Sequence, residues 1–81
     1  MARLQAHLVS QMAPARKAQG LTQQQLSHMA GVSRQTIVEI EAGGYNPSTI
    51  LALRLATALD TTVEELFQLP PPIAPALSTR Q

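Results

Sequence analysis

The segment from Gln23 to Ala42, QQQLSHMAGVSRQTIVEIEA, places small, apolar and polar residues in the order that two helices joined by a tight turn require. Thr22 is a natural N-cap, and Gln25, three residues later, completes a capping box. Gly31 suits the turn because glycine adopts a positive φ without strain. Ser33 then caps the second helix. The segment therefore predicts two short helices that cross at Gly31.

The two helices are expected over residues 23–30 and 34–41, and each has apolar residues on one side. The predicted inward residues are Leu26, Met29 and Ala30 on the first helix, and Ile37 and Ile40 on the second. Burial of these residues leaves the opposite side of the second helix free. The arrangement is that of a helix-turn-helix motif.

The free side of the second helix carries Arg34, Gln35, Val38 and Glu39. The forked hydrogen-bonding groups of Arg and Gln match the edges of guanine and adenine, respectively. Val38 could touch a thymine methyl group, and Glu39 could accept from a cytosine amine or repel phosphate and so sharpen specificity. In the family that this motif resembles, named below, the positions of Arg34 and Gln35 point at DNA bases, and we expect all four residues to contact bases; the alternative is an ordinary solvated helix face.

This motif, with the strings YNPS at 45–48 and LALRLATALDTTVEELF at 51–67, resembles the phage Cro and repressor-like helix-turn-helix family, also called the xenobiotic-response-element (XRE) type. The likeness runs from about Ser10 to Leu69. It implies an all-α, compact, five-helix lambda-repressor-like domain whose third helix enters the major groove of double-stranded DNA. Such domains usually bind a two-fold related operator as homodimers.

The resemblance also implies contacts to DNA phosphates from Gln23, Ser33, Thr36, Gly44, Tyr45 and Asn46. In the family, the amide at the position of Gln23 holds a phosphate and braces the recognition helix; the alternative is a plain surface glutamine. Gly44 stands where many relatives carry Lys or Arg. One electrostatic contact is therefore missing from this loop.

Arg16 and Glu41 have a structural interpretation. By resemblance they form an ion pair across the first and third helices, in a charge-assisted and bidentate geometry that fixes the first helix on the motif. Removing one partner of a buried pair leaves the other charge stranded.

The fourth helix is expected to begin after Ser48, which we favour as its cap over Asn46. Its body, ILALRLATALD at 50–60, is apolar nearly all round. Such a helix belongs at the centre of a bundle, so the lone Arg54 must reach the surface or a partner.

The first helix is expected at about 13–19, and the fifth begins with a second capping box formed by Thr62 and Glu65. The residues of the fifth helix predicted to face inward are Val63, Leu66 and Phe67. The pattern indicates no strands.

The chain divides into three regions: an N-terminal arm at 1–9, the helix-turn-helix domain at 10–69, and a Pro-rich tail or linker at 70–81. Leu4 and Leu8 lie one helical turn apart. The arm is either a frayed start or an extra amphipathic turn that packs on the domain or on a partner subunit.

Composition narrows the function. The 81 residues make one small domain with no cysteine and a net charge of +1, which is low for a DNA-binding protein. The absence of cysteine fits a reducing cytoplasm and excludes disulfides. The family resemblance implies a bacterial or phage protein that is associated with the nucleoid. His7 and His28 have no acidic residue at ligand-like spacing, so we expect no metal, cofactor or enzymatic activity. No apolar run reaches the roughly 18 residues of a membrane span, so we expect none.

Three functions remain open. The first is a transcriptional regulator, in particular a repressor, that acts as a homodimer joined through the fifth helix or the arm; Leu66, Phe67 and Leu69 are candidates for the contact. The second is an antitoxin-type interaction protein with a toxin or other protein partner and autoregulatory DNA binding. The third is the N-terminal part of a longer regulator that responds to a small-molecule effector.

Overall fold

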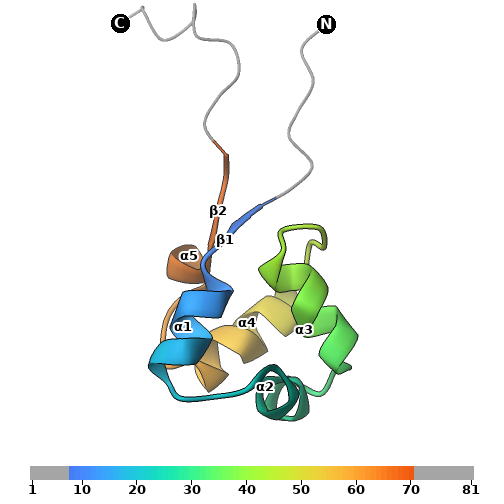
Figure 1. Cartoon of the computed structure of the whole chain (residues 1–81). Coiled ribbons are helices and arrows are strands. Elements are labelled where there is room, and N and C mark those ends of the chain that lie inside the picture. The colour runs from blue at the N-terminus through green and yellow to red at the C-terminus, as the bar shows by residue number, and fades with distance from the viewer. Residues whose placement is uncertain (1–7, 71–81) are drawn as a thin grey trace, which may run out of the picture.

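The computed structural model describes residues 8–70, which form five helices and a two-stranded ribbon (Figure 1). The elements are β1 (Val9–Ser10), α1 (Met12–Ala18), α2 (Gln23–Ala30), α3 (Arg34–Glu41), α4 (Thr49–Ala58), α5 (Val63–Leu66) and β2 (Phe67–Gln68). The prediction of an all-α, five-helix lambda-repressor-like domain is confirmed. The expectations for Leu4 and for the tail beyond Pro70 lie outside the described residues.

Side-chain caps fix where the central helices begin. The Thr22 hydroxyl accepts from the Gln25 backbone N–H at 3.0 Å, while the Gln25 carbonyl oxygen accepts from the Thr22 N–H at 2.8 Å. The Ser48 hydroxyl accepts from the Leu51 N–H at 3.1 Å, so α4 starts where the sequence predicted. These bonds satisfy N–H groups that the helix itself leaves unpaired.

Only one of the two hydrogen bonds of the predicted capping box of α5 is present. The Thr62 hydroxyl accepts from the Glu65 N–H at 3.2 Å. The Glu65 carboxylate instead accepts from the Thr61 hydroxyl at 2.5 Å. A second hydroxyl one residue earlier competes for the carboxylate, and residue spacing alone could not rank the two.

Two turns in the chain need a left-handed backbone. Gly31, between α2 and α3, has φ of 76° and is followed by the Val32 N–H donating to the Ser27 carbonyl at 3.0 Å. Asp60, after α4, has φ of 56°, which Asp tolerates better than most residues. Both residues end a helix, as expected for a left-handed cap.

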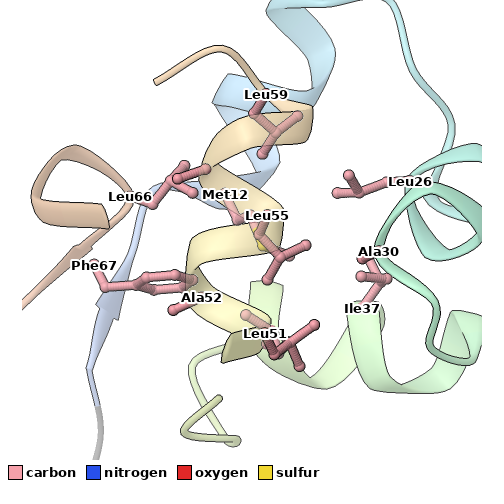
Figure 2. Close-up of a cluster of buried hydrophobic side chains, with 12 residues drawn as sticks. Met12, Leu26, Ala30, Ile37, Leu51, Ala52, Leu55, Leu59, Leu66 and Phe67 are labelled. Atoms are coloured by element: carbon pink, nitrogen blue, oxygen red, sulfur yellow. The ribbon is translucent and has the colours of Figure 1, made fainter. Parts of the chain in front are cut away.

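Apart from Phe67 and the thioether of Met12, the core is aliphatic, and it is organised around the inner side of α4 (Figure 2). The largest fully buried hydrophobic side chains are Met12, Leu26, Ile37, Ile40, Leu55, Leu59 and Leu66. Figure 2 shows Leu55 of α4 between Leu26 and Ile37 on one side and Leu66 and Phe67 on the other. Burial of this set positions α3 with its opposite side toward solvent.

The prediction for α2 is wrong at one position. Met29 is 54 % exposed, whereas Ser27 is 1 % exposed and its hydroxyl donates to the Gln24 carbonyl at 2.7 Å. A small side chain occupies the inner side of α2, and that hydrogen bond satisfies its hydroxyl. Met29 therefore lies at the edge of the helix, toward α4.

The prediction that α4 is surrounded by protein is also wrong. Leu55 is buried, but Ile50 is 65 % and Leu53 is 55 % exposed. A domain of this size has too few elements to cover both sides of a helix. One apolar side of α4 therefore faces solvent.

The expectation of no strands is corrected by β1 and β2. They pair in antiparallel orientation, with Val9 opposite Gln68 and Ser10 opposite Phe67. Phe67 is 8 % exposed, and the Gln11 N–H donates to the Leu66 carbonyl at 2.8 Å. Phe67 thus faces inward as predicted, but from a strand. Within residues 8–70, no helix is long and apolar enough to cross a membrane.

Candidate nucleic-acid interface

The outer side of α3 is set by the burial of its inner side. Ile37 is fully buried and Ile40 is 1 % exposed, so residues about half a helical turn away face solvent. Arg34, Gln35 and Glu39 are exposed, and Val38 is half-buried beside them. The four predicted base-contact residues therefore lie on the solvent side of one short helix or at its margin.

Arg34 is held at the N-terminal end of this surface by a residue from α2. Its Nη2 donates to the Gln23 carbonyl oxygen Oε1 at 3.1 Å. A guanidinium has five N–H donors, so this single bond leaves the group able to donate to a forked acceptor. The contact restricts where Arg34 can point and does not use up its recognition chemistry.

The Gln23 side chain can be assigned one orientation from the chemistry of its two neighbours. Its Nε2 donates to Glu41 Oε1 at 3.1 Å, and a carboxylate can only accept. Its carbonyl oxygen faces Arg34, which can only donate. Reversing the amide would break both hydrogen bonds.

Glu41 connects this pair to the body of the domain. Arg16 donates from Nε to Glu41 Oε2 at 2.6 Å and from Nη2 to Glu41 Oε1 at 3.3 Å. Arg16 Nη1 also donates to the Leu21 carbonyl at 2.9 Å. The two charged side chains are only 11 % and 9 % exposed. A chain of hydrogen bonds thus runs from Arg16 in α1 to Arg34 on the surface of α3.

The remaining outer residues of α3 contact each other. Gln35 Nε2 donates to Glu39 Oε2 at 3.3 Å, between residues one helical turn apart. Both groups are exposed, so the bond is weak and exchangeable with another partner.

The residues predicted to contact phosphates occupy both ends of α3 and a position beside it. Ser33 and Thr36 lie at its N-terminal end, where the Ser33 hydroxyl accepts from the Thr36 N–H at 3.1 Å and lies 3.0 Å from the Thr36 hydroxyl. Gln23 of α2 lies beside α3, hydrogen-bonded to Arg34 and to Glu41. The loop after α3 carries the other three, Gly44, Tyr45 and Asn46, all exposed (Figure 1). The Gly44 N–H donates to the Glu39 carbonyl at 3.0 Å, which ties the loop to the helix end.

The sequence did not indicate that Gln23 bonds Glu41 and Arg34 together. These residues are 18 and 11 positions away from Gln23, and no local pattern reports such a contact. In the described part of the chain, no group of three or more His, Cys, Asp or Glu residues could hold a metal ion.

The fold and this surface define a lambda-repressor-like domain with a helix-turn-helix at α2 and α3. Residues 15–66 match the protein-family model described as helix-turn-helix, which covers more than half of the chain. The protein therefore belongs to the Cro and repressor-like, XRE-type helix-turn-helix family. By family it is a transcriptional regulator, which is a DNA-binding class and not a class of enzymes.

Individual relatives support this assignment. An uncharacterized HTH-type transcriptional regulator of Methanothermobacter thermautotrophicus is 51 % identical over 53 residues, which are 64 % of this chain and 77 % of the relative. The crystal structure of the restriction-modification controller protein C.AhdI from Aeromonas hydrophila is 39 % identical, with a TM-score of 0.64 over 69 % of this chain and 85 % of that one.

A third match comes from the SinR protein/SinI protein complex. It is 27 % identical, with a TM-score of 0.62 over 67 % of this chain. This chain spans 53 % of that protein, about half its length.

Proposed function

We propose that the protein is a sequence-specific repressor that binds a two-fold symmetric operator as a homodimer, in the bacterial or phage-infected cytoplasm. The observation that carries the proposal is the position of Arg34, an exposed guanidinium on the outer side of α3 that is hydrogen-bonded through Gln23 to a nearly buried ion pair. A side chain oriented before binding loses less conformational entropy when it meets a base.

We assign base contacts to the outer side of α3. Arg34 suits the O6 and N7 acceptors of guanine, and Gln35 suits the N6 and N7 groups of adenine. Val38 offers methyl groups to a thymine methyl, and Glu39 accepts from the N4 amine of cytosine. Gln35 can exchange its bond to Glu39 for a base because both residues are exposed.

We assign phosphate contacts to Gln23 of α2, to Ser33 and Thr36 at one end of α3, and to Gly44, Tyr45 and Asn46 at the other. Groups at both ends of a helix that lies in the major groove meet the two phosphate backbones that border it. Gln23 retains one amide N–H for a phosphate after its bond to Glu41. Domain residues 10–69 contain all of these groups.

The low net charge of the chain supports a dimer. With a net charge of +1, one copy gains little from non-specific attraction to DNA. One α3 contacts only a few base pairs, so a single copy discriminates poorly against the competing sites of a genome. Two copies related by a two-fold axis double the contacts, on half-sites about 34–36 Å apart.

A second function has one observation in its favour. The SinR match comes from a complex of two different proteins. An antitoxin-type or similar interaction protein, with the helix-turn-helix serving autoregulation, is therefore the alternative to a plain repressor.

Selection of bound duplexes from random DNA tests the proposal. We expect an inverted repeat with half-site centres about one helical turn apart and a guanine within each half-site. Light scattering of the selected complex should give two chains per operator. Selected sites without inverted symmetry, or one chain per site, would refute the homodimer; failure to enrich any sequence would refute specific binding.

Placing the selected operator between a promoter and a reporter gene then tests repression, which requires reduced expression when the protein is present.

A further inference from the structure

Arg34 and Glu41 are the first and last residues of α3, about 10 Å apart along the helix axis. Their side chains are nonetheless linked, because both hydrogen-bond to Gln23 of α2, at 3.1 Å in each case. One end of the link is a carboxylate side chain that is only 9 % exposed, and the other is an exposed guanidinium on the proposed base-contact surface. A nearly buried acid is therefore connected to the residue that we expect to read a base.

Each hydrogen bond in this link has a fixed direction of donation. The Arg16 guanidinium can only donate, to Glu41 Oε2 at 2.6 Å and to Glu41 Oε1 at 3.3 Å. Because Oε1 can only accept, Gln23 faces it with Nε2 and holds its own carbonyl oxygen toward Arg34. The orientation of the Gln23 amide, and with it the acceptor offered to Arg34, is therefore set by the carboxylate.

The carboxylate is itself held in place. Arg16 Nη1 donates to the Leu21 carbonyl at 2.9 Å, so the guanidinium that fixes Glu41 is also anchored to the backbone. Both side-chain bonds of Gln23 involve a charged partner, but the bond to Glu41 is partly buried and the bond to Arg34 is exposed. A hydrogen bond sheltered from water is the stronger of the two, so the inner partner decides which way the amide points.

We propose that Glu41 is a positioning residue for base recognition, and that its carboxylate acts through Gln23 to direct the Arg34 guanidinium at guanine. The inference rests on the proposed function and assigns part of its base choice to a residue outside the proposed DNA contacts. One of the five N–H groups of Arg34 is used by Gln23, which leaves a pair for the O6 and N7 acceptors of guanine. Glu41 thus has a second role besides its ion pair.

Restraint of Arg34 favours a base over a phosphate. A free arginine side chain has several rotatable bonds and reaches the phosphates that border the groove as readily as the bases. The acceptor on Gln23 removes part of this freedom before DNA is bound, which lowers the entropy lost on forming a forked contact. Without that acceptor, Arg34 should still add affinity through phosphates while its preference for guanine declines.

Glu41→Gln tests the proposal by changing one oxygen into an NH2 group at almost constant volume. Arg16 Nε, at 2.6 Å, should retain the remaining oxygen, so the new NH2 group faces Gln23. Gln23 must then turn its carbonyl oxygen inward and its NH2 group toward Arg34, where two donors meet. We expect the guanine preference, about 5- to 150-fold for a bidentate contact, to fall at least about threefold.

Fluorescence anisotropy measures this preference as the ratio of affinities for the selected operator and for duplexes with that guanine replaced in one half-site. Circular dichroism establishes that each variant is folded at the temperature of the titration. Glu64→Gln is the matched control, because it makes the same change at an exposed carboxylate on α5 and should keep the parent ratio. An unchanged ratio in folded Glu41→Gln would overturn the proposal.

An exchange variant separates positioning from a structural role. Gln23→Glu combined with Glu41→Gln restores the direction of every bond, because the carboxylate at position 23 accepts both from the amide at position 41 and from Arg34. The guanine preference should return toward the parent value. Affinity for all sequences should stay low, because a carboxylate at position 23 repels phosphate. A purely structural Glu41 predicts no such recovery, so a folded exchange variant that lacks the preference would contradict the proposal.

A third variant covers the case in which Glu41→Gln does not fold. Arg16→Met with Glu41→Leu replaces the nearly buried ion pair with an apolar pair, which should retain stability but leaves Gln23 without its inner acceptor. We expect a folded protein whose guanine preference is at least about threefold lower than that of the parent. A folded variant with the parent preference would show that Glu41 supplies stability alone.

A measurement without DNA separates this proposal from the proposed function. Nuclear magnetic resonance order parameters of the Arg34 Nε–H bond report its mobility in the free protein, which should rise in Glu41→Gln and fall again in the exchange variant. If the parent selects no DNA sequence but shows this pattern, the positioning of Arg34 stands and the proposed function fails. If an operator is selected and neither the mobility nor the guanine preference changes, the function stands and Glu41 is excluded as a positioning residue.

Discussion

Helices α3 and α4 pack into the same core, yet their outer sides differ in kind. The outer side of α3 carries Arg34, Gln35 and Glu39, each hydrogen-bonded to another side chain. That of α4 carries Ile50 and Leu53, more than half exposed. Water solvates a polar surface well, whereas covering an apolar surface lowers the free energy. One small domain therefore presents two chemically distinct surfaces, one polar and one apolar.

The two surfaces also differ in what supports them from beneath. The side chain of Arg34 on α3 is connected to Arg16 of α1 by hydrogen bonds through Gln23 and Glu41. The inner side of α4 is wholly aliphatic. A mutation in the ion pair should therefore destabilise the domain, while changes on the outer side of α4 should leave the fold intact.

The largest expected effect is that of Glu41→Ala. Removal of the carboxylate strands the nearly buried Arg16 guanidinium and releases Gln23, at a cost of about 3 kcal/mol in the free energy of unfolding. For a domain of this size the melting temperature should fall by more than about 10 °C. Thermal unfolding followed by circular dichroism measures the change.

A double variant and a control sharpen this prediction. Arg16→Met with Glu41→Leu should recover much of the loss, because a matched apolar pair leaves no charge to desolvate. Glu64→Ala removes an exposed carboxylate from α5 and should change stability by less than about 0.5 kcal/mol. If Glu41→Ala melts like the parent, the pair does not support α3 and the contrast with α4 disappears.

Arg34→Ala is expected to have the next largest effect, on binding rather than stability. Loss of a bidentate contact to guanine should weaken binding to the preferred operator by about 1–3 kcal/mol per half-site and relax the choice at one base pair. Fluorescence anisotropy on the preferred operator and on single-base variants measures both quantities.

The exposed Gln24→Ala on α2 is the control for Arg34→Ala and should retain the base preference. An affinity loss that is equal on all sequences would make Arg34 a phosphate contact. Unchanged affinity would remove it from the interface and leave α3 without its main recognition group.

Features that depend on neighbours within four residues were predictable from the sequence. The caps at Thr22 and Ser48 and the bounds of α2 and α3 follow from local hydrogen bonds and from periodicity, and the structure agrees. The overall arrangement of the five helices was predicted by the family resemblance, because local sequence patterns do not encode it.

Features that depend on distant residues were not predictable. Met29 and Ser27 both fit the periodicity of α2, and only the approach of neighbouring helices decides that the smaller one is buried. The outer side of α4 looks like core because apolar periodicity does not report how many elements surround a helix. The pairing of Val9 with Gln68 joins the two ends of the domain, which no window along the chain can detect.

The loop between α3 and α4 provides a smaller effect on stability. Gly43 has φ of 84°, and a Cβ there would lie 3.4 Å from the Leu8 carbonyl oxygen. Gly43→Ala should therefore lower the free energy of unfolding by about 1–2 kcal/mol. Gly44→Ala is the paired control, since its Cβ would meet no atom within 4 Å and its φ is not positive. Equal stability of the two variants in urea unfolding would show that the loop does not fix the end of α3.

The smallest expected effect is a gain. Gly44 lies in open space next to the proposed phosphate contacts, so Gly44→Lys can be accommodated while the N–H at this position still donates to the Glu39 carbonyl. A cation there adds one phosphate contact per copy, which should raise operator affinity severalfold at low salt. The slope of log K against log salt should steepen by about 0.9 per added contact, or roughly twice that for a dimer. Gly44→Ala should reproduce the parent slope.

Because the contact carries no sequence information, Gly44→Lys should also tighten binding to unrelated duplexes by a similar factor. A gain confined to the operator, or an unchanged slope, would show that this loop does not lie along the phosphate backbone, and would limit the DNA-binding surface to the N-terminal end of α3.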